Sequence, residues 1–363
     1  MKVGLVGASR RLANFYVPIL RQLTDKYEIV GFTTFSAEGF RRFESKTGIQ
    51  SFRNAEELIA KAKPELLILA VPDPINEVTV MNLLDLKVPI LAETPLAWSA
   101  SGTRRVIKKA AANNMLLSVA EQFPFMPREQ FRKQLLTSGA LGTIYVVHND
   151  LHSYKYHGIA QLRRYLNGKP LRVRCTGVTF PPLMIDNVHA LWQIASVTYD
   201  DGSLLVYNYC HPANGMDGHR SIRIFGAFGV MHNDEIKMTE PTSKKTDTIP
   251  VVQTETPSGH LASISANIPK VGRLAWQNPY EAYPFCEEQI GVASVLDGMH
   301  RSVREGAPPP YSAQDFLTDI EIEQAFRYSG LRDGASVSLP LSEWQQKAHL
   351  MTNPRFVKQL LTK

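Results

Sequence analysis

Residues 2–14 read Lys-Val-Gly-Leu-Val-Gly-Ala-Ser-Arg-Arg-Leu-Ala-Asn. The apolar run that ends at Gly7 predicts a short buried strand, and apolar residues then recur at helical spacing as far as Leu23. Proline is tolerated in the opening turn of a helix, so Pro18 predicts that this helix begins near Asn14 or Phe15. The stretch therefore predicts a strand, a tight turn and a helix in direct succession.

This succession is the setting of the phosphate-binding turn of a Rossmann fold, whose pattern is GxGxxG. Gly7 fills the first position, but Ser9 and Leu12 replace the second and third glycines. The second glycine lets the backbone approach a pyrophosphate and the third lets helix and strand pack closely, so both replacements weaken the motif. An ordinary strand-to-helix turn is the alternative. The cofactor-binding residues expected here are Gly7, Ser9, Arg10, Arg11 and Leu12.

Apolar runs alternate with helical segments through the first 120 residues. Further strands are expected at residues 28–34, 65–72, 88–92 and 115–120, and helices at residues 38–47, 77–86 and 99–113. This alternation predicts an α/β fold with a doubly wound, parallel sheet.

The end of the second expected strand bears on the choice of cofactor. An NAD enzyme usually has an acid there, which binds the ribose hydroxyls. This chain has Thr33, Thr34 and Ser36 instead, followed by Arg41 and Arg42. Hydroxyls and arginines suit a 2′-phosphate better, so the sequence favours NADP over NAD as the cofactor.

The length of 363 residues exceeds what one core usually fills, so two domains are expected: 1–122 and 123–363. Strand patterns recur in the second part at residues 142–148, 222–226 and 229–232. Asp201-Gly202 predicts a hairpin with a type I′ turn. Ser312 and Asp315 predict the start of a helix that stops near Gly330. Residues 238–259 are expected to form an exposed excursion.

Composition narrows the class of protein. The three cysteines lie far apart and no apolar run is long enough to span a bilayer, which favours a cytoplasmic protein without disulfides, zinc knuckle or membrane segment. The net charge is +6, but the basic pairs are scattered. A nucleic-acid surface would gather them on one element, so none is expected. No spacing of histidines or cysteines favours a metal site.

Four segments are similar to the Gfo/Idh/MocA family of sugar and polyol oxidoreductases. They are Ala70-Val-Pro72 with Asn76, Glu93-Thr94-Pro95 in the place of a Glu-Lys-Pro motif, residues 138–145, and residues 304–340. They occur in the family's order along nearly the whole chain. The resemblance implies a nucleotide-binding domain followed by an α+β domain with an open, mainly antiparallel sheet that pairs subunits into a homo-dimer or homo-tetramer.

The resemblance also implies which residues contact the nicotinamide half of the cofactor. Val71, Pro72 and Asn76 would contact it from one strand end. Glu93 and Thr94 would hold the nicotinamide ribose, and Pro95 would fix the turn through a cis bond. Gln122 would reach the ribose or the substrate. Thr94 stands where the family has its lysine, and threonine cannot carry a proton as lysine can.

In family members that lysine, an aspartate and a histidine handle the proton. The corresponding segment here is Ser153 to Gly158, expected to precede a helix over residues 159–166. His157 matches the histidine, whereas Ser153 stands in the place of the aspartate. Lys155 and Tyr156 are the candidates to assist His157 as cation or acid. A capping or surface role is the alternative for all three side chains.

These observations favour an NAD(P)-dependent oxidoreductase that acts on a sugar, a polyol or a sugar-like carbonyl, with altered proton-transfer residues. Two other interpretations stay open. One is a family member without redox turnover that binds a ligand as a regulator, and the other is a lyase or hydrolase on the same scaffold.

Overall fold

The computed structural model describes residues 1–151, 155–185, 188–211, 220–239 and 244–346. Its chain divides into two compact units. Unit 1 comprises Met1–Phe125 and Phe285–Leu317, and unit 2 comprises Met126–Pro284 and Thr318–Lys363. Residues 285–317 thus pack with the N-terminal segment although they lie between the two segments of unit 2 in sequence. The division into domains at residue 122 stays a prediction.

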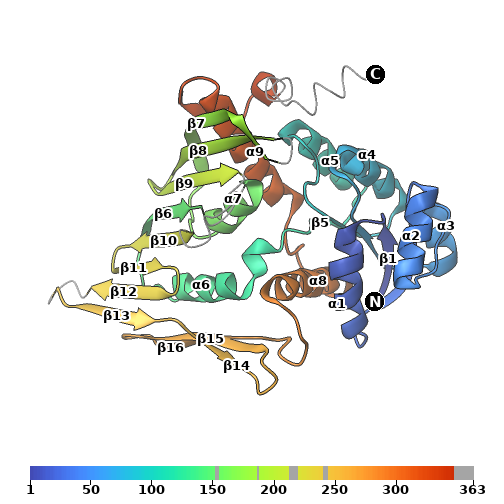
Figure 1. The fold of residues 1–363 in the computed structure, drawn as a ribbon, viewed down its shortest axis with the longest axis horizontal. Coiled ribbons are helices and arrows are strands. Elements are labelled where there is room, and N and C mark those ends of the chain that lie inside the picture. Colours follow the sequence, from blue (N-terminus) through green and yellow to red (C-terminus); the bar gives the residue numbers. More distant parts are fainter. Residues whose placement is uncertain (152–154, 186–187, 212–219, 240–243, 347–363) are drawn as a thin grey trace. The chain divides into compact units, whose positions relative to one another are not determined.

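Unit 1 is built on a parallel sheet of five strands in the order β2-β1-β3-β4-β5. Figure 1 labels β1 and β5 of this sheet. The strands are β1 (Lys2–Val6), β2 (Glu28–Thr33), β3 (Leu66–Leu69), β4 (Ile90–Ala92) and β5 (Leu117–Val119). β3, β4 and β5 are buried along their whole length, as expected for strands that are covered on both faces. The predicted doubly wound α/β sheet is confirmed.

The helices of unit 1 follow the strands in the expected alternation. They are α1 (Val17–Gln22), α2 (Ala37–Thr47), α3 (Ala55–Ala62), α4 (Asp73–Leu83), α5 (Ala100–Ala112) and α8 (Glu287–Glu305). Ser36, Asn54 and Ser99 cap α2, α3 and α5 with side-chain oxygens. Helix α3 was not expected from the sequence. Helix α4 begins four residues before its expected start, because Pro74 lies in the first turn, where proline is tolerated.

The first helix begins earlier than expected. Helical structure starts at Arg10, and a π-helical turn, η1 (Leu12–Tyr16), leads into α1. Val17 N–H reaches back to the carbonyl of Leu12, which is the five-residue bond of a π turn. The wider turn accommodates Pro18, which lies in the first turn of α1. The predicted start near Asn14 or Phe15 was therefore wrong.

Unit 2 contains an open sheet of nine strands in the order β13-β12-β11-β10-β6-β9-β8-β7-β17. Among these neighbours only β6 and β9 are parallel, so the mainly antiparallel sheet is confirmed. The strands are β6 (Ile144–Asp150), β7 (Pro170–Ile185), β8 (Val188–Tyr199), β9 (Leu204–His211), β10 (Ser221–Gly226), β11 (Gly229–His232), β12 (Glu235–Thr239), β13 (Thr246–Pro250) and β17 (Val337–Ser338).

The hairpin between β8 and β9 has a different turn from the expected one. Tyr199 N–H donates to the Ser203 carbonyl, which leaves a loop of three residues, and only Gly202 has a positive φ, of 83°. A type I′ turn needs two such residues. The hairpin is confirmed, whereas the type I′ turn was wrong: a tight turn closed by a left-handed glycine stands in its place.

The remaining elements of unit 2 also correct two expectations. The helix after β6 is α7 (Lys155–Arg163), which begins four residues before the expected start. The supposed excursion contains β13 and also β14 (Val252–Glu255), which joins β15 (Leu261–Ile268) and β16 (Gly272–Gln277) in a second sheet. Threonine and valine favour strands even in an exposed segment, and every residue of β14 is exposed. The other helices are α6 (Pro127–Thr137) and α9 (Ala313–Gly330), of which residues 313–317 belong to unit 1.

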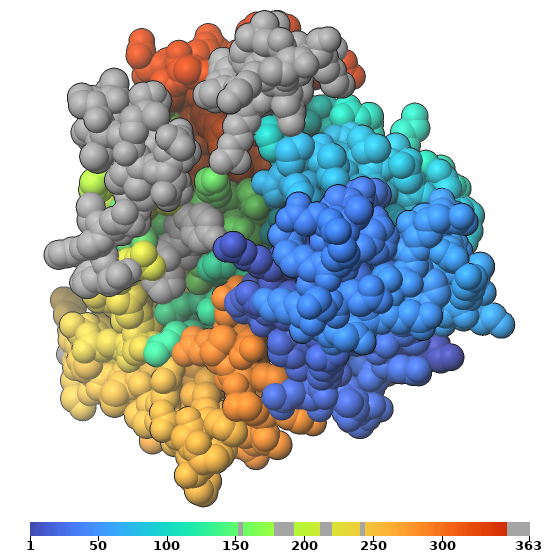
Figure 2. All heavy atoms as spheres, turned by 45° about the vertical axis from the view of Figure 1, so that its right-hand side comes forward, coloured from blue at the N-terminus to red at the C-terminus, as the bar shows by residue number. Residues whose placement is uncertain are grey.

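In the space-filling view the N-terminal residues, blue to cyan, form one continuous body (Figure 2). None of the helices among the described residues is both long and apolar enough to cross a membrane.

Candidate functional site

The candidate site begins at the carboxyl edge of the parallel sheet, where β1 runs into the first helix. Gly7 has φ +116°, and its N–H donates to the carbonyl of Thr33 at 2.8 Å. A Cβ built on Gly7 would lie 2.2 Å from the carbonyl oxygen of Ala70. No other residue fits this position without movement, so the first glycine of the motif is a steric requirement of the fold.

The helix that follows presents free backbone donors. Ser9 accepts from the N–H of Leu12 with its Oγ and from the N–H of Ala13 with its carbonyl, so it caps the helix. The N–H groups of Arg10 and Arg11 precede the first intrahelical bond and have no partner among the described residues. A helix N-terminus of this kind binds phosphate. Leu12, at the third glycine position, is fully buried in the core.

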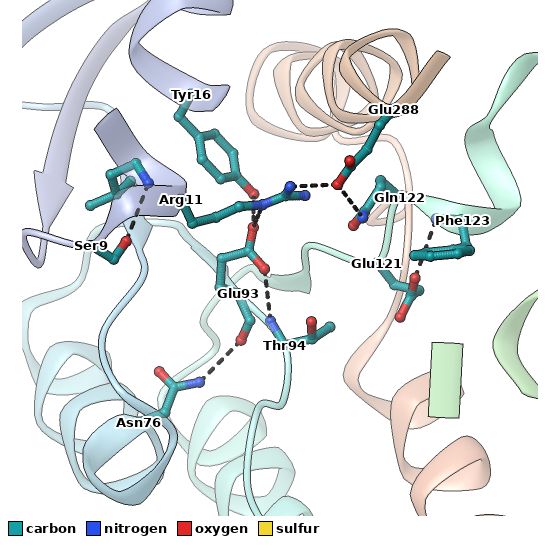
Figure 3. A network of polar contacts seen from close by, with 11 residues as sticks. Ser9, Arg11, Tyr16, Asn76, Glu93, Thr94, Glu121, Gln122, Phe123 and Glu288 are labelled. Atoms are coloured by element: carbon teal, nitrogen blue, oxygen red, sulfur yellow. Dashed lines mark hydrogen bonds and ion pairs between the residues drawn. The ribbon is translucent and has the colours of Figure 1, made fainter. Parts of the chain in front are cut away.

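Arg11 extends from this helix to the end of β4. Its Nε donates to Oε1 of Glu93 at 2.9 Å, and the hydroxyl of Tyr16 donates to the same oxygen at 2.8 Å (Figure 3). Burial acts against the charged guanidinium, but Glu93 and Tyr16 outweigh it and raise the pKa of Arg11. Burial, and after it Glu93, raises the pKa of Tyr16 well above its usual value. Arg11 thus stays charged and Tyr16 stays a neutral donor.

Helix α8 supplies the second carboxylate of this network. Nη1 of Arg11 donates to Oε1 of Glu288 at 2.6 Å, and Nε2 of Gln122 donates to the same atom at 3.2 Å. Figure 3 shows the Arg11 guanidinium between the carboxylates of Glu93 and Glu288. Neither Tyr16 nor Glu288 was expected from the sequence, because nothing in the local pattern around them signals contacts with residues 77 and 277 positions away.

Glu93, Thr94 and Pro95 form a tightly held turn after β4. The Thr94–Pro95 bond is cis, as predicted. Oε2 of Glu93 accepts from the backbone N–H of Thr94 at 3.1 Å. Asn76, on α4, donates through Nδ2 to the carbonyls of Glu93 and Pro95 at 3.0 and 2.7 Å. Asn76 is therefore the side chain that fixes the shape of this turn.

Three buried polar atoms at this edge have no hydrogen-bond partner: Oγ1 of Thr33, Oδ1 of Asn76 and Oε1 of Gln122. Their residues are 4%, 2% and 5% exposed. A buried polar atom without a partner costs about 1–3 kcal/mol. All three belong to residues expected to bind the cofactor, so the edge is suited to a ligand that supplies the missing partners.

The residues after β2 divide into two groups. Ser36 uses its hydroxyl to accept from Gly39 N–H, so it caps α2, and Thr34 lies half-buried beside it. Arg41 and Arg42 are exposed on α2, and Nη2 of Arg42 donates to the carbonyl of Ala8 at 3.1 Å. Arg42 is thereby held next to the phosphate-binding turn.

The two residues expected to meet the nicotinamide from the end of β3 differ in exposure. Val71 is half-buried and Pro72 is exposed.

The three expected proton-handling residues lie in the first turn of α7, in unit 2. His157 is 9% exposed, and its ring lies 4.4 Å from that of Tyr156. Lys155 has φ +49°, and its carbonyl accepts from the hydroxyl of Tyr207 at 3.2 Å. Ser153 lies outside the described residues. Among the residues described, no group of three or more His, Cys, Asp or Glu could hold a metal ion.

The comparison with family models finds a match in the N-terminal segment of unit 1. Residues 1–121 match the model described as an oxidoreductase family with an NAD-binding Rossmann fold, Gfo/Idh/MocA. The matched segment makes up one third of the chain. The resemblance drawn from the sequence is thereby confirmed, and the Gfo/Idh/MocA match covers the segment that carries Gly7, Arg11 and Glu93.

Individual relatives agree with this Gfo/Idh/MocA assignment. Inositol 2-dehydrogenase of Rubrobacter xylanophilus is 30% identical over 98 residues, 27% of this chain and 28% of the relative. The curated relatives are matched over only 28–38% of their own length. The structure of levoglucosan dehydrogenase, solved with NADH and levoglucosan, is similar to this one with a TM-score of 0.72 and 16% sequence identity. The similarity covers 94% of this chain and 100% of that enzyme's chain.

A second solved structure shows the same fold. The WlbA dehydrogenase of Bordetella pertussis, solved with NADH and UDP-GlcNAcA, covers 94% of this chain and 98% of its own, with a TM-score of 0.68 and 18% identity. At these identities the likeness concerns the fold.

Proposed function

We propose that the protein is a nicotinamide-dinucleotide-dependent oxidoreductase that acts on a sugar, a polyol or a sugar-like carbonyl. The observation that carries the proposal is the pair of free N–H groups of Arg10 and Arg11 above Gly7, where the helix N-terminus is ready for a diphosphate. The unpartnered atoms of Thr33, Asn76 and Gln122 support it. The substrates named for levoglucosan dehydrogenase and inositol 2-dehydrogenase support the substrate class.

In this mechanism the residues of unit 1 bind and orient. The amides of Arg10 and Arg11 would hold the diphosphate, and Glu93, fixed by Arg11 and Tyr16, would hold the nicotinamide ribose. A bound nicotinamide supplies the hydride acceptor or donor. His157 would take the hydroxyl proton during oxidation, because imidazole titrates near neutral pH. Lys155 and Tyr156 would assist it in place of the family lysine that Thr94 replaces.

We further propose that NADP is preferred over NAD. The end of β2 lacks the acid that binds a ribose 2′-hydroxyl, and Arg42 is held by Ala8 beside the phosphate-binding turn. A guanidinium there would pair with a 2′-phosphate.

Subunit pairing through the nine-stranded sheet, as a homo-dimer or homo-tetramer, is part of the proposal. Ile194 on β8 is 58% exposed, on the face of the sheet opposite to the buried Ala195 and Val197, and it would lie in such an interface. Sedimentation velocity would then give a dimer or tetramer, and Ile194→Lys would shift it to monomer.

A second candidate function is a ligand-binding protein without redox turnover, favoured by Thr94 in the place of the proton-carrying lysine. Two measurements separate the candidates. A thermal-shift titration with NADP, NADPH, NAD and NADH shows whether a dinucleotide binds. Oxidation of a panel of sugars and polyols, followed as NADPH or NADH absorbance, shows whether turnover occurs. Binding without turnover across the panel favours the second candidate.

A further inference from the structure

The charged groups at the end of β4 do not balance. Arg11 is the cation of the network, and Glu93 and Glu288 are its two carboxylates, 2.9 and 2.6 Å away. We call these three residues the carboxylate clamp. Its net charge is −1, because each carboxylate carries one negative charge and the guanidinium carries one positive charge. The side chains of Arg11, Glu93 and Glu288 are 23%, 12% and 39% exposed, so water screens the excess charge only in part.

A separate observation connects the clamp to a ligand. Gln122 donates its amide N–H to Glu288 at 3.2 Å, while its Oε1 is buried and has no partner. An amide held at one end by the clamp and unsatisfied at the other is suited to accept a hydrogen bond from a bound molecule. Asn76 repeats this arrangement, because its Nδ2 holds the Glu93 turn while its Oδ1 is unpartnered.

We propose that the carboxylate clamp makes this protein select the oxidised form of its dinucleotide over the reduced form. This inference rests on the proposed function, which assigns Glu93 to the nicotinamide end of the cofactor. The oxidised nicotinamide ring carries a positive charge and the reduced ring is neutral. A net negative charge beside the ring therefore stabilises the oxidised form, and the remainder of the molecule, common to both forms, is unaffected.

The residue after Glu93 strengthens this bias. Thr94 is uncharged, whereas a lysine in its place would carry one positive charge. The net negative charge of the carboxylate clamp is therefore not neutralised by the residue after Glu93. Arg11 cannot compensate further, because both of its engaged nitrogens already face carboxylates. The same charge pattern disfavours an anionic group at this end of the site, which points to a substrate that is neutral where it meets the nicotinamide.

The test measures the ratio of the dissociation constants of the reduced and oxidised dinucleotide by isothermal titration calorimetry on the full chain. Glu288→Gln removes one negative charge from the clamp and Thr94→Lys adds one positive charge beside it, so each raises the local net charge by one unit from a different element. Each is expected to lower the ratio about tenfold, the order of a partly screened unit charge at this range. Glu305→Gln is the matched control, because this exposed residue lies on the same helix but roughly 25 Å along it.

The ratio of the two dissociation constants responds only to a difference between the reduced and the oxidised dinucleotide, because a loss of affinity that both forms share cancels. A shift in both variants, with the control unchanged, supports it. An unchanged or raised ratio in either variant overturns it, while dinucleotide binding itself remains established. If the folded wild-type protein binds neither form, the proposed function is overturned, and this inference is overturned with it.

Discussion

Arg11 and Tyr16 lie five positions apart, and both donate a hydrogen bond to Oε1 of Glu93. In a regular α-helix residues three or four positions apart share a face. The π turn over residues 12–16 closes hydrogen bonds between residues five apart and so brings these two donors together. The irregular turn that accommodates Pro18 also organises the candidate site.

Gly7→Ala is expected to lower the free energy of unfolding by about 1–3 kcal/mol and to weaken dinucleotide binding at least about tenfold. The added Cβ would lie 2.2 Å from the Ala70 carbonyl oxygen, so the phosphate-binding turn must move. Urea unfolding and calorimetric titration measure the two effects. Gly48→Ala is the control, because Gly48 also has a positive φ but has no atom within 4 Å of the added Cβ. Equal binding by both variants would contradict the assignment.

Asn76→Ala should destabilise the protein by about 2–4 kcal/mol, since it removes two hydrogen bonds from buried carbonyls of the Glu93 turn. Asn113→Ala provides the comparison, because Asn113 also donates two hydrogen bonds, to the Leu84 carbonyl and to Oδ1 of Asp85, but from a half-buried position, and its loss should cost under about 1 kcal/mol. Chemical unfolding of both variants gives the difference. Similar losses would mean that the side chain of Asn76 does not hold the turn.

Arg42→Ala is expected to weaken NADPH binding about tenfold while NADH binding stays within twofold, because only NADPH has the 2′-phosphate. Arg53→Ala controls for a general loss of positive charge, since Arg53 is exposed elsewhere in unit 1. Titration of each variant with both dinucleotides decides the point. Tighter binding of NADH than NADPH by the wild type would refute the preference outright.

His157→Gln should reduce turnover by about 10²–10⁴-fold and leave dinucleotide affinity unchanged, because the residue is proposed to carry the proton alone. Steady-state turnover and calorimetric titration of the same variant separate the two effects. Retained activity in the variant would move the proton-handling role to Lys155 or Tyr156.

Stability should fall at alkaline pH partly through Cys175. Burial raises the pKa of this thiol to about 12. In the unfolded chain the thiol ionises near pH 8.5, while the folded protein still holds the proton, so stability decreases as pH rises between the two values, by up to about 1.4 kcal/mol per pH unit. Cys175→Ala should therefore show a shallower decline between pH 8.5 and 10 than the wild type. Cys286→Ala should show the same decline as the wild type, because Cys286 is exposed.

The sequence was sufficient for the parallel sheet because buried strands such as Leu66–Leu69 are continuous apolar runs between recognisable helices. It was also sufficient for the Glu93–Thr94–Pro95 turn and its cis bond. The start of the first helix was missed because a π turn has no distinct sequence pattern, and Pro18 alone suggests a later start. The hairpin turn was misjudged because Asp-Gly also fits a three-residue loop.

The candidate site was less predictable than the fold. Glu288 reaches Arg11 over 277 positions, and no local pattern indicates a contact of that range. Ser9 was regarded as a weakened glycine position, yet the structure shows it as the cap that leaves the amides of Arg10 and Arg11 free. A side chain that both replaces a motif residue and caps a helix can be interpreted only once the helix start is known.

Calorimetric titration of the wild-type protein with NADPH, NADP, NADH and NAD tests the central claim most directly. Saturable binding of at least one of them at one molecule per chain is expected, with at least about tenfold weaker binding in Gly7→Ala under conditions where circular dichroism shows that variant to be folded. Absence of binding for all four dinucleotides to folded wild-type protein, at millimolar concentration, would contradict it.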